Sequence, residues 1–405
     1  MASSGACTRV TALPDRRIVI PALGVTQILA WGSTFYLLGV LAPLIVQDMG
    51  WTYDFVVGGV SVGLLVAGVA SPRVGQLIAR DGGRRVLATG AVFLSAGLIS
   101  IGTATSFAWY IMGWVVIGLG MSASLYDAAF STLGSIYGAQ ARSAISALTL
   151  LGGFASTVCW PLSAILAAQV GWRGTCMCYA LLQIAIALPT HLLALRDVRQ
   201  TQLEAAVNTP RAVSLLPSDR WLFLVVAAVL TIAAAILSMM GTHLLPLLMA
   251  RGLDPSVAVG LGAIVGPSQV GARFIETLAG RRYDPVWTMV ASAVLVAIAA
   301  FMLIIDLSVI ALAIVLYGAG NGIGSIARGT VPLALFGSGP YPVLMGRLAL
   351  PLLVAMAVSP FVGGLAFEWG GAEWTLGLLA TIASLNVVLV VLLRIMTLRR
   401  PSART

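Results

Sequence analysis

Four ionisable residues lie inside long apolar runs of this sequence. They are Asp127, Arg273, Glu276 and Arg328. An ionisable side chain at the centre of a membrane-spanning helix costs at least about 2.5–3.5 kcal/mol, so it generally faces a partner or a water-filled cavity. In such a cavity an arginine can hold an anion, and a carboxylate can take up and release a proton. These four residues are therefore the first candidates for a functional site.

Asp127 and Arg328 occupy nearly equivalent places in an internal repeat. The Gly-x-Gly pattern at 118–120 returns at 318–320, an offset of 200 residues. With this offset, Asp127 corresponds to position 327, which is directly before Arg328. We expect opposite charges at matched depth to reach each other when one end of the molecule closes. They would then form a gate in which Asp127 takes the coupling proton. In the alternative, water near the helix ends satisfies each charge separately.

Arg273 and Glu276 are three residues apart on one predicted helix, so their side chains can form an ion pair with each other. Under this interpretation the pair is internally neutralised and structural. Under the other interpretation Arg273, together with Arg328, binds an anionic substrate, and Glu276 restrains Arg273. The sequence leaves both interpretations open.

Uncharged polar and aromatic residues of the apolar runs are further candidates for lining a cavity. The candidates for substrate binding are Trp31, Thr34, Tyr126, Gln269 and Asn321, with Gln27, Tyr36 and Tyr317 beside them. Tryptophan and tyrosine are equally expected at the membrane interface. His243 is expected either to sense protons, since histidine titrates near physiological pH, or to anchor its helix at the interface.

The composition places these residues in a membrane protein. Of the 405 residues, 59% are hydrophobic and 9% are charged, whereas soluble domains carry about 25% charged residues. The apolar runs are continuous and mostly about 20 residues or longer, so they are predicted to be helices rather than barrel strands. Twelve spans are predicted, at about 18–46, 55–78, 86–104, 108–136, 143–168, 174–195, 221–249, 257–279, 287–305, 308–334, 347–367 and 374–395. The predicted fold class is an all-α polytopic membrane protein.

The chain divides into two halves of six spans each. We predict a tail at 1–17, a bundle at 18–195, a central loop at 196–220, a second bundle at 221–395 and a tail at 396–405. A short motif occurs once in each half. In the first half it is Val-Gly at 74–75 followed by Gly-Arg-Arg at 83–85, and in the second half it is Val-Gly at 270–271 followed by Gly-Arg-Arg at 280–282. Because six is an even number, both halves enter the membrane in the same sense, which is the parallel repeat of a two-bundle transporter.

The distribution of arginine predicts the orientation in the membrane. The chain contains no lysine, and nineteen arginines lie in tails or loops on one side: Arg9, Arg16, Arg17, Arg73, Arg80, Arg84, Arg85, Arg142, Arg196, Arg199, Arg211, Arg220, Arg281, Arg282, Arg347, Arg394, Arg399, Arg400 and Arg404. Only Arg173 and Arg251 lie on the other side. Positive residues collect in cytoplasmic loops, so both termini are predicted to be cytoplasmic and the protein to lie in a bacterial inner membrane.

Several other kinds of chemistry are not predicted. The chain has no Gly-Lys-Ser/Thr motif, and its glycine-rich stretches lie inside apolar helices, so ATP is not expected to bind. No catalytic or metal-ligand cluster and no basic patch for nucleic acid emerges, so we predict no enzyme, no cofactor and no nucleic-acid partner. Cys159, Cys176 and Cys178 are interpreted as small buried hydrophobic residues, with binding of a soft metalloid as the alternative.

The loop after the second span resembles the signature of the major facilitator superfamily. The residues that carry the resemblance are Gly75, Arg80, Asp81, Gly83, Arg84 and Arg85. The family pattern is G-x-x-x-D-R-x-G-R-R, and Ala79 stands at its aspartate position. The resemblance implies two six-helix bundles, a loop that braces the halves in one state, and a central cavity lined by spans one, four, seven and ten.

Within that superfamily, Gly50-Trp51 and Arg273 are similar to the monocarboxylate and oxalate/formate exchanger branch. Segments 266–271 and 327–333 also resemble bacterial permeases, some of which are associated with metalloid efflux. The prediction is a monomeric secondary transporter that moves a small organic anion across the lipid bilayer, coupled to protons or to exchange. The alternatives are proton-coupled efflux of drugs or metalloids, and a membrane sensor without transport.

Overall fold

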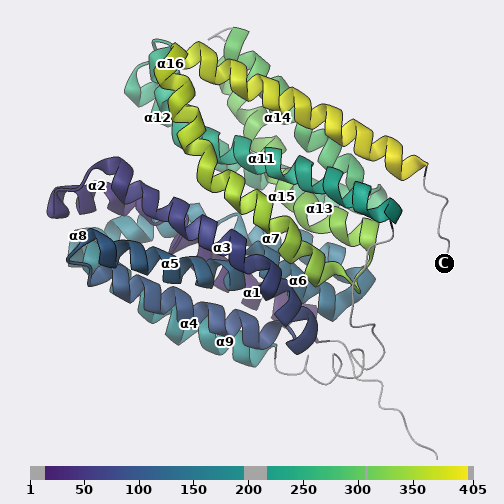
Figure 1. Cartoon of the computed structure of the whole chain (residues 1–405), viewed down its shortest axis with the longest axis horizontal. Helices are drawn as coiled ribbons and strands as arrows, with labels where there is room; N and C mark the ends of the chain where they lie inside the picture. The colour runs from purple at the N-terminus through teal and green to yellow at the C-terminus, as the bar shows by residue number, and fades with distance from the viewer. Residues whose placement is uncertain (1–13, 196–216, 306–308, 400–405) are drawn as a thin grey trace, which may run out of the picture.

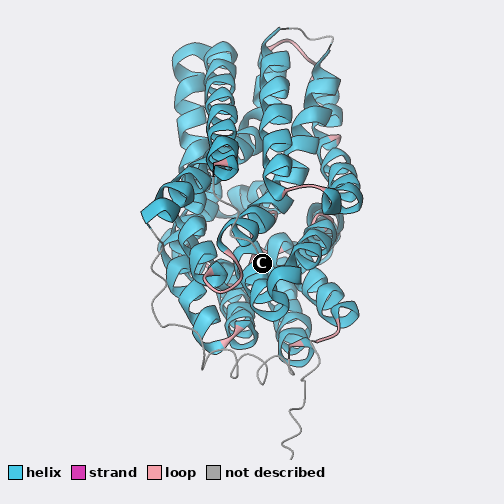
Figure 2. Cartoon of the chain, turned by 90° about the vertical axis from the view of Figure 1, so that its right-hand side faces the viewer, coloured by secondary structure: helices cyan, strands magenta, loops and turns pink. Residues whose placement is uncertain are grey.

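A computed structural model describes residues 14–195, 217–305 and 309–399, without the side chains of residues 217, 218 and 281. The predicted central loop and both predicted tails lie largely outside these ranges. In the described ranges every regular element is a helix (Figure 2). The expected fold class, an all-α polytopic membrane protein, is therefore confirmed.

The first half of the chain is a series of apolar helices with short connections. They are α1 (Arg16–Gly32), α2 (Leu38–Met49), α3 (Tyr53–Asp81), α4 (Gly83–Gly102), α5 (Phe107–Ser124), α6 (Tyr126–Tyr137), α7 (Ala141–Gly152), α8 (Ala155–Leu182) and α9 (Leu188–Ala194), with a 3-10 turn at Gly138–Gln140 and a π-helical turn at Gln183–Ala187. The π-helical turn places Gln183 Nε2 at 2.9 Å from Ser33 Oγ, which connects the sixth span to the first.

The second half repeats this pattern with fewer breaks. They are α11 (Pro217–Ala250), α12 (Pro255–Ala263), α13 (Val265–Ala279), α14 (Pro285–Ile305), α15 (Ile310–Phe336) and α16 (Tyr341–Leu398), with a 3-10 turn at Gly280–Arg282. The backbone leaves helical geometry at Gly171 in α8 and at Gly370 and Gly371 in α16. At Gly171 and Gly371 φ is positive, which glycine adopts without a steric penalty. The described residues contain eight helical stretches that are long and apolar enough to cross a membrane. When the long stretches that contain α8 and α16 are divided at these glycines, and the helices on either side of each shorter break are counted together, the described helices can be grouped into the twelve expected spans.

Four spans that the sequence predicts as single helices are broken near their middle. The breaks fall at 33–37 in span 18–46, at Leu125 in span 108–136, at 153–154 in span 143–168 and at Ile264 in span 257–279. Those four predictions of continuous helices are therefore corrected.

Each break coincides with residues that can weaken the helical hydrogen bonds. Thr34 Oγ1 donates to the Ala30 carbonyl at 2.6 Å, and such hydroxyl contacts compete with the helical ladder. The second break follows a serine-rich turn in which Ser122 makes the same kind of contact. The third coincides with a glycine, which has low helix propensity. At the fourth, Pro267 has no N–H to donate to the carbonyl of Ala263, where α12 ends.

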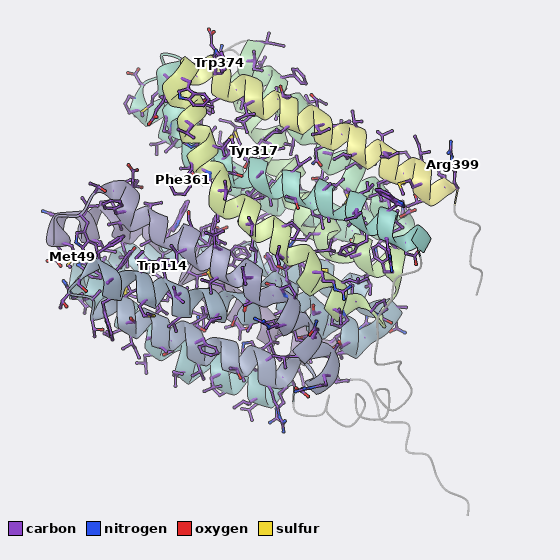
Figure 3. The ribbon with its side chains drawn as sticks, viewed as in Figure 1. Met49, Trp114, Tyr317, Phe361, Trp374 and Arg399 are labelled. Atoms are coloured by element: carbon purple, nitrogen blue, oxygen red, sulfur yellow. The ribbon has the colours of Figure 1, made fainter. Side chains whose placement is uncertain are left out.

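The two halves of the chain form two groups of helices that meet at one end and diverge at the other (Figure 1). Where they meet, α3 and α6 pack against α16, and α7 packs against α13 and α15. We call this the closed end. At the open end α2 packs against α3 and α8, and α12 packs against α11, α13 and α15, each within its own half. Figure 3 shows Met49 and Trp374 at the diverging tips and Arg399 at the opposite side of the molecule.

The loop signature lies at the closed end. A Cβ atom on Gly75 would overlap the carbonyl oxygen of Pro342 and would lie 3.1 Å from Cα of Gly346, so this glycine lets α3 and α16 approach closely. Arg80 and Asp81 instead form an ion pair with each other at 2.9 Å. The remaining signature residues follow in sequence at the start of α4, and they are Gly83, Arg84 and Arg85.

Candidate functional site

A cavity of about 140 Å³ lies between the two halves. Its wall from the first half contains Trp31, Phe35, Tyr36, Tyr126, Gly152 and Gly153. The polar residues of its wall from the second half are Gln269, Arg273, Ser292, Tyr317, Asn321, Ser325, Arg328 and Asn386. An aromatic surface therefore faces a polar surface that carries two arginines.

The aromatic surface is built where the first and fourth spans are broken. Trp31 lies in the last turn of α1, and Phe35 and Tyr36 follow in the turn at 33–37. The ring of Tyr126, at the start of α6, lies 5.2 Å from that of Trp31, and the ring of Phe35 lies 5.8 Å from it. Ring pairs at these distances stabilise one another. The two breaks thus bring four aromatic rings to one side of the cavity.

Arg273 extends from α13 into the cavity and is 7% exposed. Its Nε donates to Ser325 Oγ at 3.0 Å and to the Gly322 carbonyl at 3.2 Å. Its Nη1 lies 3.3 Å from the Thr149 carbonyl, and its Nη2 lies 3.5 Å from Gln269 Oε1. All four acceptors are uncharged. Among the described residues no carboxylate forms an ion pair with Arg273, so its positive charge is solvated by dipoles but not neutralised.

The ion pair of Arg273 with Glu276 that one interpretation of the sequence predicts does not form, although both side chains are described. Glu276 instead accepts hydrogen bonds from the hydroxyl groups of Tyr283 and of Thr288, the latter at 2.7 Å. The two side chains diverge because Arg273 extends toward α7 and α15, whereas Glu276 faces α14. Burial and the contact with Glu276 raise the pKa of Tyr283 to about 12, so its hydroxyl remains a donor at neutral pH.

Asp127 and Arg328 form an ion pair between the halves. Arg328 Nε lies 3.0 Å from Asp127 Oδ1, and Nη2 donates to Oδ2, which makes the contact bidentate. The side chains are 11% and 15% exposed, respectively. The break at Leu125 places Asp127 in the first turn of α6, where the helix dipole favours a negative charge. The structure thus brings together the two charges whose repeat positions nearly match.

Of the other predicted site residues, some line the cavity and some do not. Trp31, Tyr126, Gln269 and Asn321 line the cavity. Thr34 does not line it, because its buried hydroxyl donates to the carbonyl of Ala30. His243 does not line it either, because its Nε2 lies 2.8 Å from the carbonyl oxygen of Pro360 within the second half. Gln27, a lesser candidate, donates to the carbonyl of Ser124 at the break between α5 and α6.

Several lining residues were not anticipated from the sequence, among them Asn386, Phe35 and Ser325. Asn386 is an amide inside the last apolar run, and its polarity was a usable signal. Phe35 and Ser325 have no such signal, because phenylalanine and serine are ordinary in membrane helices. Cys159 and Cys176 are buried apart from the cavity lining. Within the described ranges no group of three or more metal-binding side chains is found.

Comparison with known proteins identifies the family. Residues 23–281, more than half of the chain, match the family model described as Major Facilitator Superfamily. Among solved structures, the crystal structure of the human organic anion transporter MFSD10 (TETRAN) is similar with a TM-score of 0.72 and 16% sequence identity. That match covers 93% of this chain and 100% of that chain, and at this identity it supports the fold alone. A search of curated proteins found no match. The chain belongs to the major facilitator superfamily and is a multi-pass membrane transporter.

Proposed function

We propose that this protein carries a small organic anion of the monocarboxylate kind across a bacterial inner membrane. The observation that supports this cargo is Arg273, a buried guanidinium in the cavity whose described partners are all uncharged. A carboxylate supplies the missing negative charge through charge-assisted hydrogen bonds. The aromatic surface that includes Trp31 and Tyr126 then holds the apolar part of the solute.

The closed end is taken to be cytoplasmic. The helix ends there carry Arg80, Arg84, Arg142 and Arg347, and positive residues collect on the cytoplasmic side. In that orientation both termini are cytoplasmic and the cavity belongs to an outward-facing state. Transport proceeds by alternating access, in which one bundle rocks against the other around the central site. One chain suffices as the transport unit, because both walls of the cavity come from it.

The pair of Asp127 and Arg328 is the proposed gate. It joins α6 of the first half to α15 of the second, so the pair must separate before the cytoplasmic side opens. Protonation of Asp127 removes the negative charge and weakens the contact. A proton gradient therefore provides the energy for transport, and exchange against a second anion is the alternative for the same site.

Ligand-dependent thermal stabilisation of the purified protein tests the cargo. The panel contains lactate, oxalate and benzoate, with glucose, a cationic dye and arsenite as the competing classes. We expect stabilisation by one or more carboxylates that is lost in Arg273→Ala. Truncating one partner of a buried charged contact weakens binding by about 100-fold or more. Arg347→Ala, which removes an exposed arginine at the closed end, is the matched control and should keep the response.

A response to the dye or to arsenite alone would replace the anion proposal by efflux of drugs or metalloids. No response in any class, together with no transport in vesicles, would favour a membrane sensor.

A further inference from the structure

Arg273 reaches across the cavity to the other half of the molecule at the place where α7 ends. Its Nη1 donates to the carbonyl of Thr149 at 3.3 Å. Gly153, four residues after Thr149, lies on the cavity wall and leaves space for this contact. A Cβ atom on Gly153 would overlap Nη1 of Arg273. The backbone at Gly153 has φ −62° and ψ −22°, which any residue adopts, so the glycine is needed for space and not for conformation.

The Thr149 carbonyl belongs to the last turn of α7. Its oxygen accepts the helical hydrogen bond from the N–H of Gly153 at 3.0 Å, so Arg273 is a second donor to the same carbonyl oxygen, which has two lone pairs. The helix dipole adds a partial negative charge at this end of the helix. The end of α7 therefore offers Arg273 a partial negative charge in a place where a carboxylate of the substrate would offer a full one.

The other end of α7 is also held by an arginine, but away from the cavity. Arg142 in the first turn of α7 donates to the carbonyls of Tyr283, at 2.9 Å, and of Gly280 in the second half. Neither contact involves a residue of the cavity wall. Helix α7 is thus fixed to the second half at both ends by arginine–carbonyl contacts, and only the contact at Thr149 adjoins the substrate site.

We propose that, in the empty carrier, the C-terminal end of α7 occupies Arg273 in place of the substrate, and that anion binding releases it. This proposal rests on the proposed anion function. The carboxylate neutralises the guanidinium, so the attraction between Arg273 and the end of α7 is lost, and with it a contact that closes the cytoplasmic side. Thr149 and Gly153 are thereby positioning residues that make opening depend on bound anion.

This contact differs from the gate formed by Asp127 and Arg328. The gate responds to a proton, and the contact at Thr149 responds to an anion. Because both must separate before the closed end opens, the carrier without substrate stays closed even when Asp127 is protonated. Movement of protons without anion is thereby suppressed.

The test uses the full chain with its four cysteines replaced by alanine and spin labels at Ala79→Cys and Leu278→Cys, on exposed positions of α3 and α13 near the closed end. Double electron–electron resonance then reports the distance between the halves. Gly153→Ala displaces Nη1, and we expect it to increase the population with an open cytoplasmic side by about tenfold without any ligand, a typical coupling between sites. Gly271→Ala, on the helix that carries Arg273 but with open space around it, is the matched control.

Lactate should open the unsubstituted protein and should add little opening to Gly153→Ala. If Gly153→Ala does not fold, Arg273→Gln removes the same contact and should open the empty carrier equally. An empty Gly153→Ala protein that stays as closed as Gly271→Ala would overturn the proposal, as would lactate that binds without opening the unsubstituted protein. Failure of the proposed anion function is recognised separately, as the absence of stabilisation by any carboxylate in the panel.

Discussion

Arg273 and Arg328 line one cavity from two helices that pack against each other, α13 and α15, yet their charges are compensated in different ways. Arg328 makes a bidentate ion pair with the carboxylate of Asp127. Arg273 is equally well supplied with hydrogen-bond acceptors, but they are two carbonyls, a hydroxyl and an amide. One arginine is neutralised by the protein, and the other is only solvated by it.

The two arginines show that hydrogen bonding and charge neutralisation are separate requirements for a buried ion. A buried ion needs hydrogen-bond partners to be tolerated, and both arginines have them. Neutralisation is a further step, and leaving it undone at Arg273 keeps a net positive charge inside the cavity. A positive charge of this kind attracts an anion from outside the protein, whereas the pair at Arg328 provides a contact that a proton can weaken.

The largest effect on transport is expected when Arg328, like Arg273, is left without a carboxylate partner. Asp127→Asn removes the negative charge and leaves Arg328 with a neutral partner. Breaking a buried pair in this way costs about 3–5 kcal/mol. The substitution therefore destabilises the closed state, in which the pair is formed. Uptake into proteoliposomes driven by a pH gradient should fall by about 100-fold or more, since about 1.4 kcal/mol corresponds to a factor of ten. Equal reconstitution of both proteins is the control, and unchanged gradient-driven uptake would exclude Asp127 as the coupling residue.

A smaller effect is expected when both charges of the pair are removed together. In Asp127→Asn combined with Arg328→Gln, neither side chain is left as an unpaired ion, and replacement of a whole buried pair is often neutral for stability. Exchange of anion between the two sides should recover to within about tenfold of the unsubstituted protein, as expected when coupling rather than binding is lost. Counterflow without a pH gradient measures this. A double variant as inactive in counterflow as Arg273→Ala would show that Arg328 binds the substrate directly.

The smallest effect on anion binding is expected from Glu276→Gln. Because Glu276 contacts Tyr283 and Thr288 and not Arg273, its charge does not compensate the cavity arginine. The apparent affinity for the stabilising carboxylate should change by no more than about twofold, since no ion pair to Arg273 is lost. A titration followed by thermal stabilisation measures it. A much tighter binding of anion in this variant would mean that Glu276 competes for Arg273, contrary to the separation described above.

The family assignment and the general fold were accessible from sequence because both rest on local signals. Twelve apolar runs, one polar segment near the middle and a repeat offset close to half the chain predict the number and grouping of the helices. The four breaks were missed because a run of apolar residues looks the same whether its helix is straight or broken. Hydroxyls such as that of Thr34, and the proline at 267, act on single backbone groups that average hydropathy does not register.

The candidate site was only partly accessible in the same way. Repeat spacing suggested that Asp127 and Arg328 would meet, since a parallel repeat places equivalent residues at the same depth. Spacing along the helix permitted an ion pair of Arg273 with Glu276, which was one of two interpretations, and that pair does not form. Three residues of separation permit contact on a helix surface, but the neighbouring helices decided which acceptors each side chain reached.

The sequence by itself determined that this chain crosses a membrane in two similar halves and that very few charges remain inside. That follows from hydropathy, which depends on composition within each span. The tertiary structure decided which of those charges are neutralised and which is left available. The partners of Arg273 and Arg328 come from helices more than a hundred residues away in the chain as well as from their own half. Only the packing of one bundle against the other brings a carboxylate to Arg328 and a helix end to Arg273.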